Sequence, residues 1–237
     1  MDIHIFLLCY NESDLIPHTI KHYKKYLPSC KITIYDNKST DDSVDIAKNL
    51  GCDIISWDSN NMINDYKYTE IKNNCWKSVE KGWIIMADMD EFLCVTEDEL
   101  KKEMELGTTI LNVEGRNMIG DCKTINLTDI DLQEIKKYVI FHPESKKLCF
   151  LREKINEMNY NLGAHNCNPQ GNVVYSLKTY INKHMKMLGI EYLININKLR
   201  YERAHLMRSC GLAVHYTLDV NELTQYYTDC YNNSKID

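Results

Sequence analysis

The sequence has 237 residues, of which 44% are hydrophobic and 26% are charged, and its formal net charge is −6. This length and balance are typical of a soluble globular protein with one substantial core, so we expect a single domain over residues 1–237. The negative charge leaves no basic surface that would attract a polyanion. Nucleic acid is therefore excluded as an expected partner.

The ten cysteines are scattered and form no C-x-x-C pair, which argues against a zinc ribbon or a redox centre. Several of them, such as Cys9 and Cys94, lie in apolar runs, where reduced cysteine acts as a small hydrophobe. We therefore expect a reducing, cytoplasmic location. No apolar run reaches the ~18 residues of a transmembrane helix, so no membrane span is predicted.

Strand and helix signals alternate through the first ~110 residues, which is typical of βαβ units that build a parallel sheet. The predicted strands cover residues 3–9, 31–35, 53–57 and 83–87. The predicted helices cover residues 13–26, with Ser13 as its cap, 41–50 and 66–81. Gly51 and Gly82 follow the last two helices, where glycine commonly ends a helix.

The alternation weakens in the second half of the chain. A helix is predicted over residues 97–106 and a strand over 109–113, and a polar, irregular region follows over 123–180. Helical patterns return from Ile190 and are interrupted by a short strand near residues 212–216. We therefore predict an α/β fold, with a Rossmann-like, mostly parallel central sheet, flanking helices and an irregular second half.

An acidic pair, Asp88 and Asp90, follows the apolar run that ends at Ala87. Two carboxylates at the end of a strand can turn toward one ion, and their hard oxygen atoms suit Mg²⁺ or Mn²⁺ that also binds substrate phosphates. A capping or turn role is the alternative for an isolated D-x-D. This pair, however, is predicted at the carboxyl edge of a parallel sheet, where open α/β folds bind ligands.

Two more polar clusters follow predicted strands: Tyr10-Asn11-Glu12-Ser13 and the run from Asp36 to Ser43. Taken singly, each is typical of a polar loop that starts a helix. The second is not an EF-hand loop, because Lys38 and Thr40 occupy its third and fifth positions and no glycine follows. Since all three clusters follow strands of one βαβ array, we expect them to meet at one edge of the sheet.

Together, these three segments resemble the family 2 glycosyltransferases of the GT-A fold. The segments are Cys9-Tyr10-Asn11-Glu12, Tyr35-Asp36-Asn37-Lys38-Ser39-Thr40-Asp41-Asp42-Ser43 and Ala87-Asp88-Met89-Asp90-Glu91-Phe92. The resemblance implies a metal-dependent enzyme that moves a sugar from a nucleotide-diphosphate sugar, with a UDP-sugar favoured, to a glycan or other hydroxyl acceptor. It implies a donor half over about residues 1–110 and an acceptor half over about residues 111–237.

The resemblance also implies roles for single residues. Asp36 would contact the base, Asp88 the ribose or the metal, and Asp90 the metal. The remaining residues that it places at the donor are Tyr10, Asn11, Glu12, Asn37, Ser39, Lys72, Met89 and Lys186. Lys72 belongs to the segment 71–77, which resembles the helix before the D-x-D strand in a cytosolic branch of the family.

Weaker resemblances extend into the second half of the chain. Residues 114–121 resemble an acceptor-side loop of the same branch, and residues 163–169 and 211–216 resemble later histidine-bearing motifs. Residues 183–186 match a strand-end segment that usually reads H-Y-K, with Met185 in place of the tyrosine.

Three histidines are candidates for completing a metal shell or contacting the acceptor. His184 is the first choice as a metal ligand, because residues i and i+2 of a strand share a face. Its imidazole could then reach the ion while the Lys186 ammonium meets the diphosphate. His165 is expected on the acceptor side. His215 has apolar neighbours in the sequence, which favours a histidine of the core.

The catalytic base and the stereochemistry stay open. An inverting enzyme needs a group that deprotonates the acceptor, for which Asp121 and Glu91 are the candidate carboxylates, whereas a retaining enzyme needs no such base. Two other functions compete with sugar transfer. One is a haloacid-dehalogenase-like phosphohydrolase, which also carries D-x-D after an apolar strand, and the other is a non-catalytic module that binds nucleotide sugars.

Overall fold

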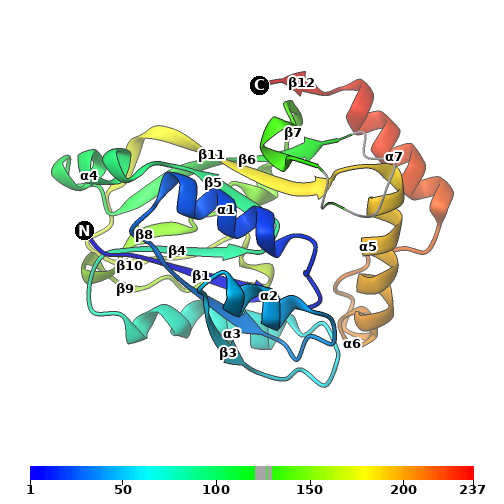
Figure 1. Cartoon of the computed structure of the whole chain (residues 1–237), viewed down its shortest axis with the longest axis horizontal. Coiled ribbons are helices and arrows are strands. Elements are labelled where there is room, and N and C mark those ends of the chain that lie inside the picture. The colour runs from blue at the N-terminus through cyan, green and yellow to red at the C-terminus, as the bar shows by residue number, and fades with distance from the viewer. Residues whose placement is uncertain (121–126, 128–129) are drawn as a thin grey trace.

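A central β-sheet takes strands from both halves of the sequence (Figure 1). The structure is a computed structural model, and it describes residues 1–120, 127 and 130–237. The strands of this sheet are β1 (Ile3–Cys9), β2 (Lys31–Asp36), β3 (Asp53–Ser56), β4 (Trp83–Asp88), β5 (Glu91–Cys94), β6 (Ile110–Ile119), β7 (Lys137–Ile140), β8 (Cys149–Leu151), β11 (Tyr175–Met187) and β12 (Lys235–Ile236). A separate small hairpin pairs β9 (Ile155–Glu157) with β10 (Gln170–Gly171).

Helices connect and flank these strands. The α-helices are α1 (Ile16–Tyr26), α2 (Ser43–Asn49), α3 (Asp65–Asn74), α4 (Glu97–Glu105), α5 (Ile190–Arg203), α6 (His205–Ser209) and α7 (Val220–Asn232). The short 3₁₀ turns are η1 (Cys75–Ser78), η2 (Leu132–Glu134), η3 (His142–Glu144), η4 (Arg152–Lys154) and η5 (Leu162–Ala164).

The sheet is mostly parallel. Its order is β12-β7-β6-β8-β4-β1-β2-β3, and β11 pairs with both β5 and β6. The block β4-β1-β2-β3 is parallel throughout, and the long β6–β11 pair is parallel as well. Most antiparallel pairs, such as β4 with β8, are shorter. The mixed α/β class, mostly parallel sheet and flanking helices that the GT-A resemblance predicts are therefore confirmed.

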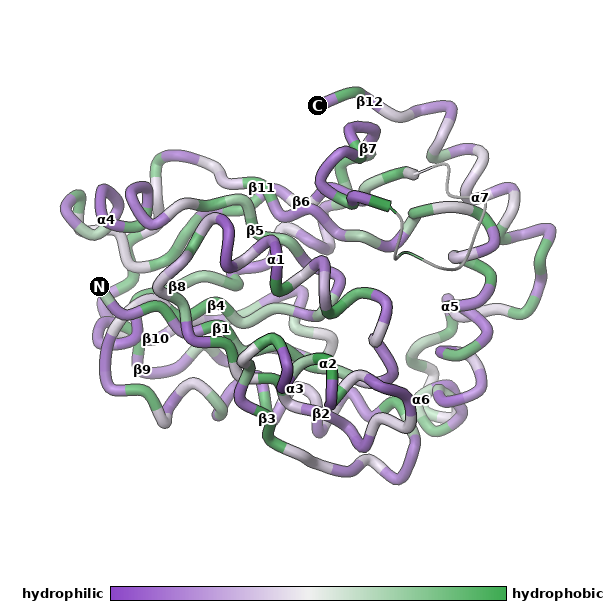
Figure 2. The backbone as a smooth tube through the Cα atoms, viewed as in Figure 1, coloured by the Kyte–Doolittle hydropathy of each residue, from purple (hydrophilic) through white to green (hydrophobic). Residues whose placement is uncertain are grey.

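Side chains alternate between the two faces of the sheet along β1 and β4. On β4, Ile85 and Ala87 join the core that packs on α1 and α2, whereas Ile84 and Met86 join the core that contains Trp76 and the face of α3. The central strands are correspondingly the most apolar part of the chain (Figure 2). Because the alternation has a period of two, Asp88 continues the Ile84–Met86 row and faces α3.

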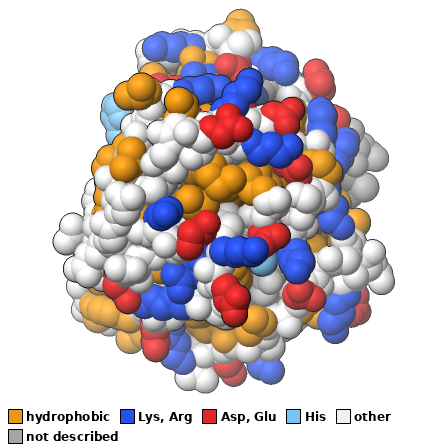
Figure 3. Space-filling model, turned by 90° about the vertical axis from the view of Figure 1, so that its left-hand side faces the viewer, with side chains coloured by type: hydrophobic (Ala, Val, Ile, Leu, Met, Phe, Trp, Pro, Cys, Tyr) orange, Lys and Arg blue, Asp and Glu red, His pale blue; other side chains and the backbone are white. Residues whose placement is uncertain are grey.

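Helices α5, α6 and α7 lie beyond the carboxyl ends of β4 and β11 (Figure 1). The opposite end of the molecule carries α4 and the start of β11, and it displays interspersed acidic and basic side chains with apolar ones between them (Figure 3). In the described parts of the chain, no helix combines the length and apolar character needed to cross a membrane.

Several local predictions differ from the structure. Ser13 does not cap α1: the helix begins at Ile16, after a turn in which the amide of Ile16 donates to the carbonyl of Glu12 at 3.0 Å. No strand forms at residues 212–216, because the positive φ of Ala213, 52°, bends the backbone there into a turn. The residues of this segment therefore do not pair with a neighbouring strand in the described structure.

One segment predicted to be a loop is a strand instead, and one segment without a predicted structure is also a strand. Residues 114–119, expected in an acceptor-side loop, belong to β6, which has a strand partner on each side. The residues after the acidic pair form β5, which aligns Glu91 with His184 on β11. Both strands form for one reason: pairing with β11, which is distant in sequence, extends the backbone where local patterns are weak.

Candidate active site

A cavity of about 570 Å³ opens at the carboxyl ends of the parallel strands. Its wall combines both halves of the chain: the end of β1, the face of α3, the turn after β4, the 3₁₀ turns η3 and η5, the end of β11 and the helix α5. This is the edge at which the sequence predicted the three polar clusters to meet, and it is where open α/β sheets bind ligands.

The loops after β1 and β2 are joined by hydrogen bonds. The amide of Asn11 donates to Oγ of Ser39 at 2.9 Å, and the amide of Thr40 donates to Oδ1 of Asn11 at 2.8 Å. Asn11 has a positive φ of 51°, a conformation that asparagine tolerates better than most residues. The amide of Ser39 also donates to Oδ2 of Asp36 at 3.2 Å. The two loops therefore form one polar unit at the cavity edge.

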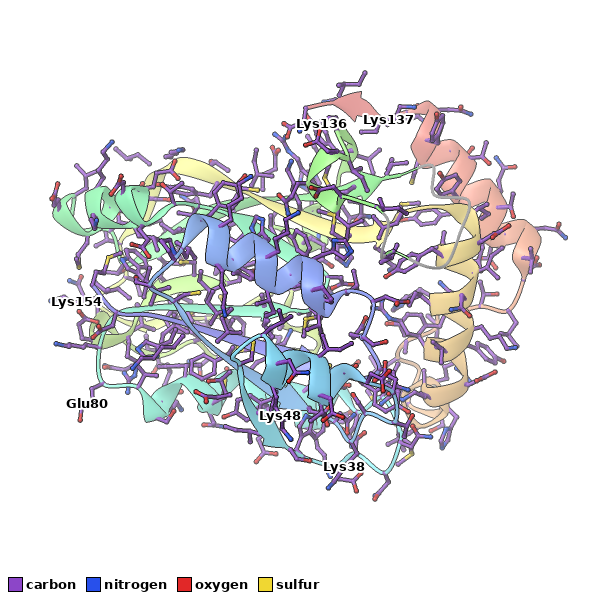
Figure 4. The ribbon with its side chains drawn as sticks, in the orientation of Figure 1. Lys38, Lys48, Glu80, Lys136, Lys137 and Lys154 are labelled. Carbon is purple, nitrogen blue, oxygen red and sulfur yellow. The ribbon has the colours of Figure 1, made fainter. Side chains whose placement is uncertain are left out.

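The predicted donor residues divide into two groups in this structure. Those that line the cavity are Tyr10, Asn11, Glu12, Lys72, Asp88, Met89 and Lys186. Asp36, Asn37 and Ser39 lie behind this wall, and Asp36 and Asn37 are buried. Within the same loop, Lys38 points away from the molecule (Figure 4). The side chain of Met89 packs in the core, where the residue is 2% exposed.

Asp88 meets two lysine ammonium groups on the α3 side of the sheet. The Lys72 ammonium lies 2.8 Å from Oδ1 of Asp88, and the Lys146 ammonium lies 3.3 Å from Oδ2. Burial alone would raise the pKa of Asp88, but the two lysines outweigh it and lower this pKa below its usual value. Asp88 is therefore held as a carboxylate at the mouth of the cavity.

Asp90 meets an imidazole and a guanidinium on the opposite side of the turn. Its Oδ2 lies 3.3 Å from Nε2 of His184 and 3.3 Å from Nη2 of Arg200. Burial would raise the pKa of Asp90, but His184 and Arg200 hold it well below its usual value. On the far side of the ring, Nδ1 of His184 lies 2.7 Å from Oδ1 of Asn117, which fixes the ring plane.

A buried lysine holds the acidic turn from behind. The Lys146 ammonium lies 2.8 Å from Oε1 of Glu91 and 2.8 Å from Oε2 of Glu144, besides its contact with Asp88. The other oxygen of Glu91 accepts the amide of Asp88 at 2.7 Å. Gly115 lets β6 approach this group closely, because a Cβ there would lie 2.3 Å from the carbonyl carbon of Glu144. This cluster therefore fixes the conformation of the Asp88–Asp90 turn.

Two basic side chains from the second half of the chain, Arg203 and Lys186, reach the cavity. The Arg203 guanidinium stacks on Tyr10, with Cζ 3.2 Å from the ring centroid. In the described part of the chain, no side chain forms an ion pair or hydrogen bond with the Lys186 ammonium. Burial, followed by the nearby Arg200, lowers the pKa of Lys186 to about 8.

The candidate catalytic residues occupy different places. Glu91 is 1% exposed, does not line the cavity and is bound to Lys146, which suits a positioning role better than proton transfer. Asp121 lies outside the described residues. His165 is exposed and lines the cavity. His215 is exposed and also lines the cavity, so its prediction as a core histidine is wrong.

Five charged residues of the site were missed by the sequence analysis: Asp65, Glu144, Lys146, Arg200 and Arg203. Asp65 had a usable signal, since Asp65, Thr69 and Lys72 follow i, i+4, i+7 spacing on one face of α3 and all line the cavity. Glu144 and Lys146 lie in the polar, irregular region, where no periodicity marks them.

The residues present fit a divalent cation in part. Asp90 and His184 offer an oxygen and a nitrogen that lie close enough to bind one ion, and such a mixed set suits Mn²⁺. Asp88 is held by the two lysines instead. Within residues 1–120, 127 and 130–237, no group of three or more His, Cys, Asp or Glu side chains is arranged to hold a metal. The protein shell is thus incomplete, which is usual for ions that also bind substrate phosphates.

Comparisons with known proteins give partial matches. No protein-family model matches the chain. A stretch of 55 residues, 23% of this chain, is 33% identical to Protein RfbJ of Shigella flexneri and spans 43% of that protein.

Among solved structures, S. aureus TarS 1-349 in complex with UDP-GlcNAc is similar with a TM-score of 0.46 and 14% identity, over 98% of this chain and 72% of that one. A longer TarS structure is covered over 39% of its length. Glucosyl-3-phosphoglycerate synthase from Mycobacterium tuberculosis, in complex with Mn²⁺, UDP and glucosyl-3-phosphoglycerate, has a TM-score of 0.34 and 15% identity, over 48% and 44% of the two chains. At these values, the activity of this chain must be inferred from its own residues.

Proposed function

We propose that this chain is a glycosyltransferase that moves a sugar from a nucleotide-diphosphate sugar to a hydroxyl acceptor. One observation carries the proposal. The loop after β1, the Asp88–Asp90 turn and basic side chains from both halves of the chain all line one cavity. A phosphohydrolase of the haloacid-dehalogenase type needs a free carboxylate nucleophile. Here, both Asp88 and Asp90 are engaged by basic side chains, which favours a structural and electrostatic role for them.

The donor would lie with its nucleoside near the loops after β1 and β2 and its diphosphate near the acidic turn. Tyr10 offers an aromatic face for a base, and the Asp36 segment resembles uridine-binding members of the family, which favours a UDP-sugar. Lys186 and Arg200 would meet the phosphates, because both line the cavity and the Lys186 ammonium has no anionic partner among the described residues. A basic wall of this kind stabilises the negative charge of a departing diphosphate.

Asp90 and His184 would hold Mn²⁺ or Mg²⁺ at the edge of this diphosphate site. When bound, such an ion supplies further neutralisation of the leaving group. The contribution of the chain itself is to aim the two ligands. Asn117 fixes the imidazole of His184, while Lys146 and Glu91 fix the turn that carries Asp90.

The test is a panel of nucleotide-diphosphate sugars assayed for nucleotide release, with wild-type protein, Mn²⁺ and either a mixture of sugar acceptors or water alone. We expect release from one donor class, UDP-sugars first, and its loss in Asp90→Asn. Donor binding without any release would support a non-catalytic binding module. Hydrolysis of p-nitrophenyl phosphate with Mg²⁺, without release from any donor, would support a phosphohydrolase.

A further inference from the structure

The imidazole of His165 faces the cavity in a defined tautomer. Its Nδ1 lies 2.9 Å from the carbonyl oxygen of Pro143. A carbonyl oxygen can only accept a hydrogen bond, so Nδ1 carries the proton. In the neutral ring, Nε2 is then left with a free lone pair. His165 lines the cavity, and in the described part of the chain no residue forms a hydrogen bond or ion pair with Nε2.

The loop that carries His165 is held at several points. Asn73, next to Lys72 on α3, makes two hydrogen bonds with the backbone of Tyr160, at 2.8 and 3.1 Å. The phenol of Tyr160 donates to the carbonyl of Lys147 at 2.9 Å. The amide of Asn161 donates to the carbonyl of Asn166 at 3.0 Å and closes the loop around His165. The imidazole is therefore carried by a braced loop, as proton transfer requires.

The backbone beside His165 is shaped around the ring. A Cβ at Gly163 would lie 3.0 Å from Cδ2 and 3.3 Å from Nε2 of His165, and Gly163 has a φ of 77°. Ala164 is buried and also has a positive φ, 55°, which is an uncommon conformation for a residue with a side chain. Uncommon backbone conformations cluster at functional sites. Here they let the ring lie close to its own loop.

His165 is linked to the acidic turn indirectly, through η3. Its hydrogen-bond partner, Pro143, belongs to η3, and the next residue, Glu144, binds the Lys146 ammonium that contacts Asp88. The carboxylates on this path, Glu91 and Glu144, are buried and held by Lys146. Two other carboxylates line the cavity without a side-chain hydrogen bond or ion pair in the described structure: Asp65, across from His165 on α3, and Glu12, in the loop after β1. Glu12 lies in the loop proposed to hold the donor, so among the described residues we compare His165 with Asp65 as proton acceptors.

We infer that Nε2 of His165 is the base that deprotonates the acceptor hydroxyl, an inference that rests on the proposed function. The hydroxyl O–H bond breaks and its proton passes to Nε2 while the oxygen bonds to the anomeric carbon. The bond from that carbon to the diphosphate breaks, and the leaving group takes its electron pair. His165 becomes an imidazolium ion and returns the proton to solvent, to which it is exposed. Attack opposite the leaving group gives an inverted product.

The histidine is chosen over Asp65 because its orientation is fixed. The hydrogen bond to Pro143 fixes the ring of His165, which lines the cavity, and leaves Nε2 without a hydrogen-bond partner, whereas no hydrogen bond or ion pair in the described structure orients the carboxylate of Asp65. Geometry is the first requirement of a general base.

The test uses nucleotide release from the best donor of the panel, with water as acceptor, in His165→Ala, His165→Gln and Asp65→Asn. His142→Ala is the matched control, since His142 is exposed on η3 and does not line the cavity. We expect both His165 variants to lose about a hundredfold or more in turnover. UDP affinity should stay unchanged, imidazole should restore part of the rate in His165→Ala, and the control should match wild type.

Two results would overturn the assignment in favour of Asp65 or of a positioning role alone. The first is retained turnover in His165→Ala. The second is a loss of turnover that imidazole does not rescue, together with an Asp65→Asn variant that is equally inactive. A product of retained configuration, read by NMR of the anomeric proton, would overturn it as well. If wild-type protein releases nucleotide from no donor, the proposed function itself fails. That result is distinct from a turnover that the replacement of His165 leaves unchanged.

Discussion

Nε2 of His184 lies 3.3 Å from Oδ2 of Asp90, although the two residues are far apart in the sequence. The pairing of β11 with β5 produces this contact, because it sets His184 directly opposite Glu91, the neighbour of Asp90. The amide of Met185 donates to the carbonyl of Asp90 at 2.7 Å and continues the pairing into the turn. The long strand from the second half thus brings a nitrogen ligand to the acidic turn of the first half.

Asp90→Asn should abolish nucleotide release and leave the protein folded. The amide keeps the shape of the carboxylate and can still accept a bond from Arg200, but it removes the negative charge that faces His184 and the proposed cation. Asp90→Ala should also lower stability, because it leaves Arg200 without its partner. Circular dichroism and thermal melting of both variants separate the two effects. An Asp90→Asn variant that releases nucleotide at the parental rate contradicts the metal-diphosphate site.

Mn²⁺ alone should raise the melting temperature slightly, and Mn²⁺ with UDP should raise it much more. The reason is the incomplete protein shell, in which phosphate oxygens must supply the missing ligands. A ligand present at a hundred times its Kd stabilises by about 2.7 kcal/mol, which is readily seen in a thermal shift. UDP with EDTA is the control. Equal shifts with EDTA and with Mn²⁺ would mean that nucleotide binding does not depend on a metal.

Lys146→Met should destabilise the protein by about 3–5 kcal/mol, because it removes one partner of a buried ion cluster. Glu91 and Glu144 would be left buried without the ammonium that lies 2.8 Å from each of them. Urea unfolding measures the change. Lys154→Met is the control, since Lys154 is exposed and points away from the molecule (Figure 4). A loss below about 1 kcal/mol would indicate that water reaches these carboxylates freely.

The parts of the site that the sequence predicted are those with strong local patterns. Asp88 and Asp90 follow a buried apolar strand, and His184 and Lys186 sit near the end of another. Lys146 and Glu144 gave no such signal. Their position depends on η3 and on the close approach of Glu144 to Gly115, both of which arise from long-range packing. Arg200 was equally hidden, because a charged residue on a helix is usually solvated and only the placement of α5 over the cavity shows otherwise.

His184→Ala should lower nucleotide release steeply, and high Mn²⁺ should restore part of it. The substitution removes one proposed ligand and leaves Asp90, so the ion binds more weakly and mass action can compensate. A histidine with a purely structural role would lose stability when replaced, and Mn²⁺ would not rescue its activity. A titration of rate against Mn²⁺, for wild type and variant, measures the shift.

His165→Ala should keep the parental Mn²⁺ dependence at a much lower rate. The reason is that the imidazole of His165 contacts Pro143 and reaches the acidic turn only through η3. If His165→Ala instead shifts the Mn²⁺ titration while His184→Ala does not, the metal ligand is His165 and the roles of the two histidines are reversed.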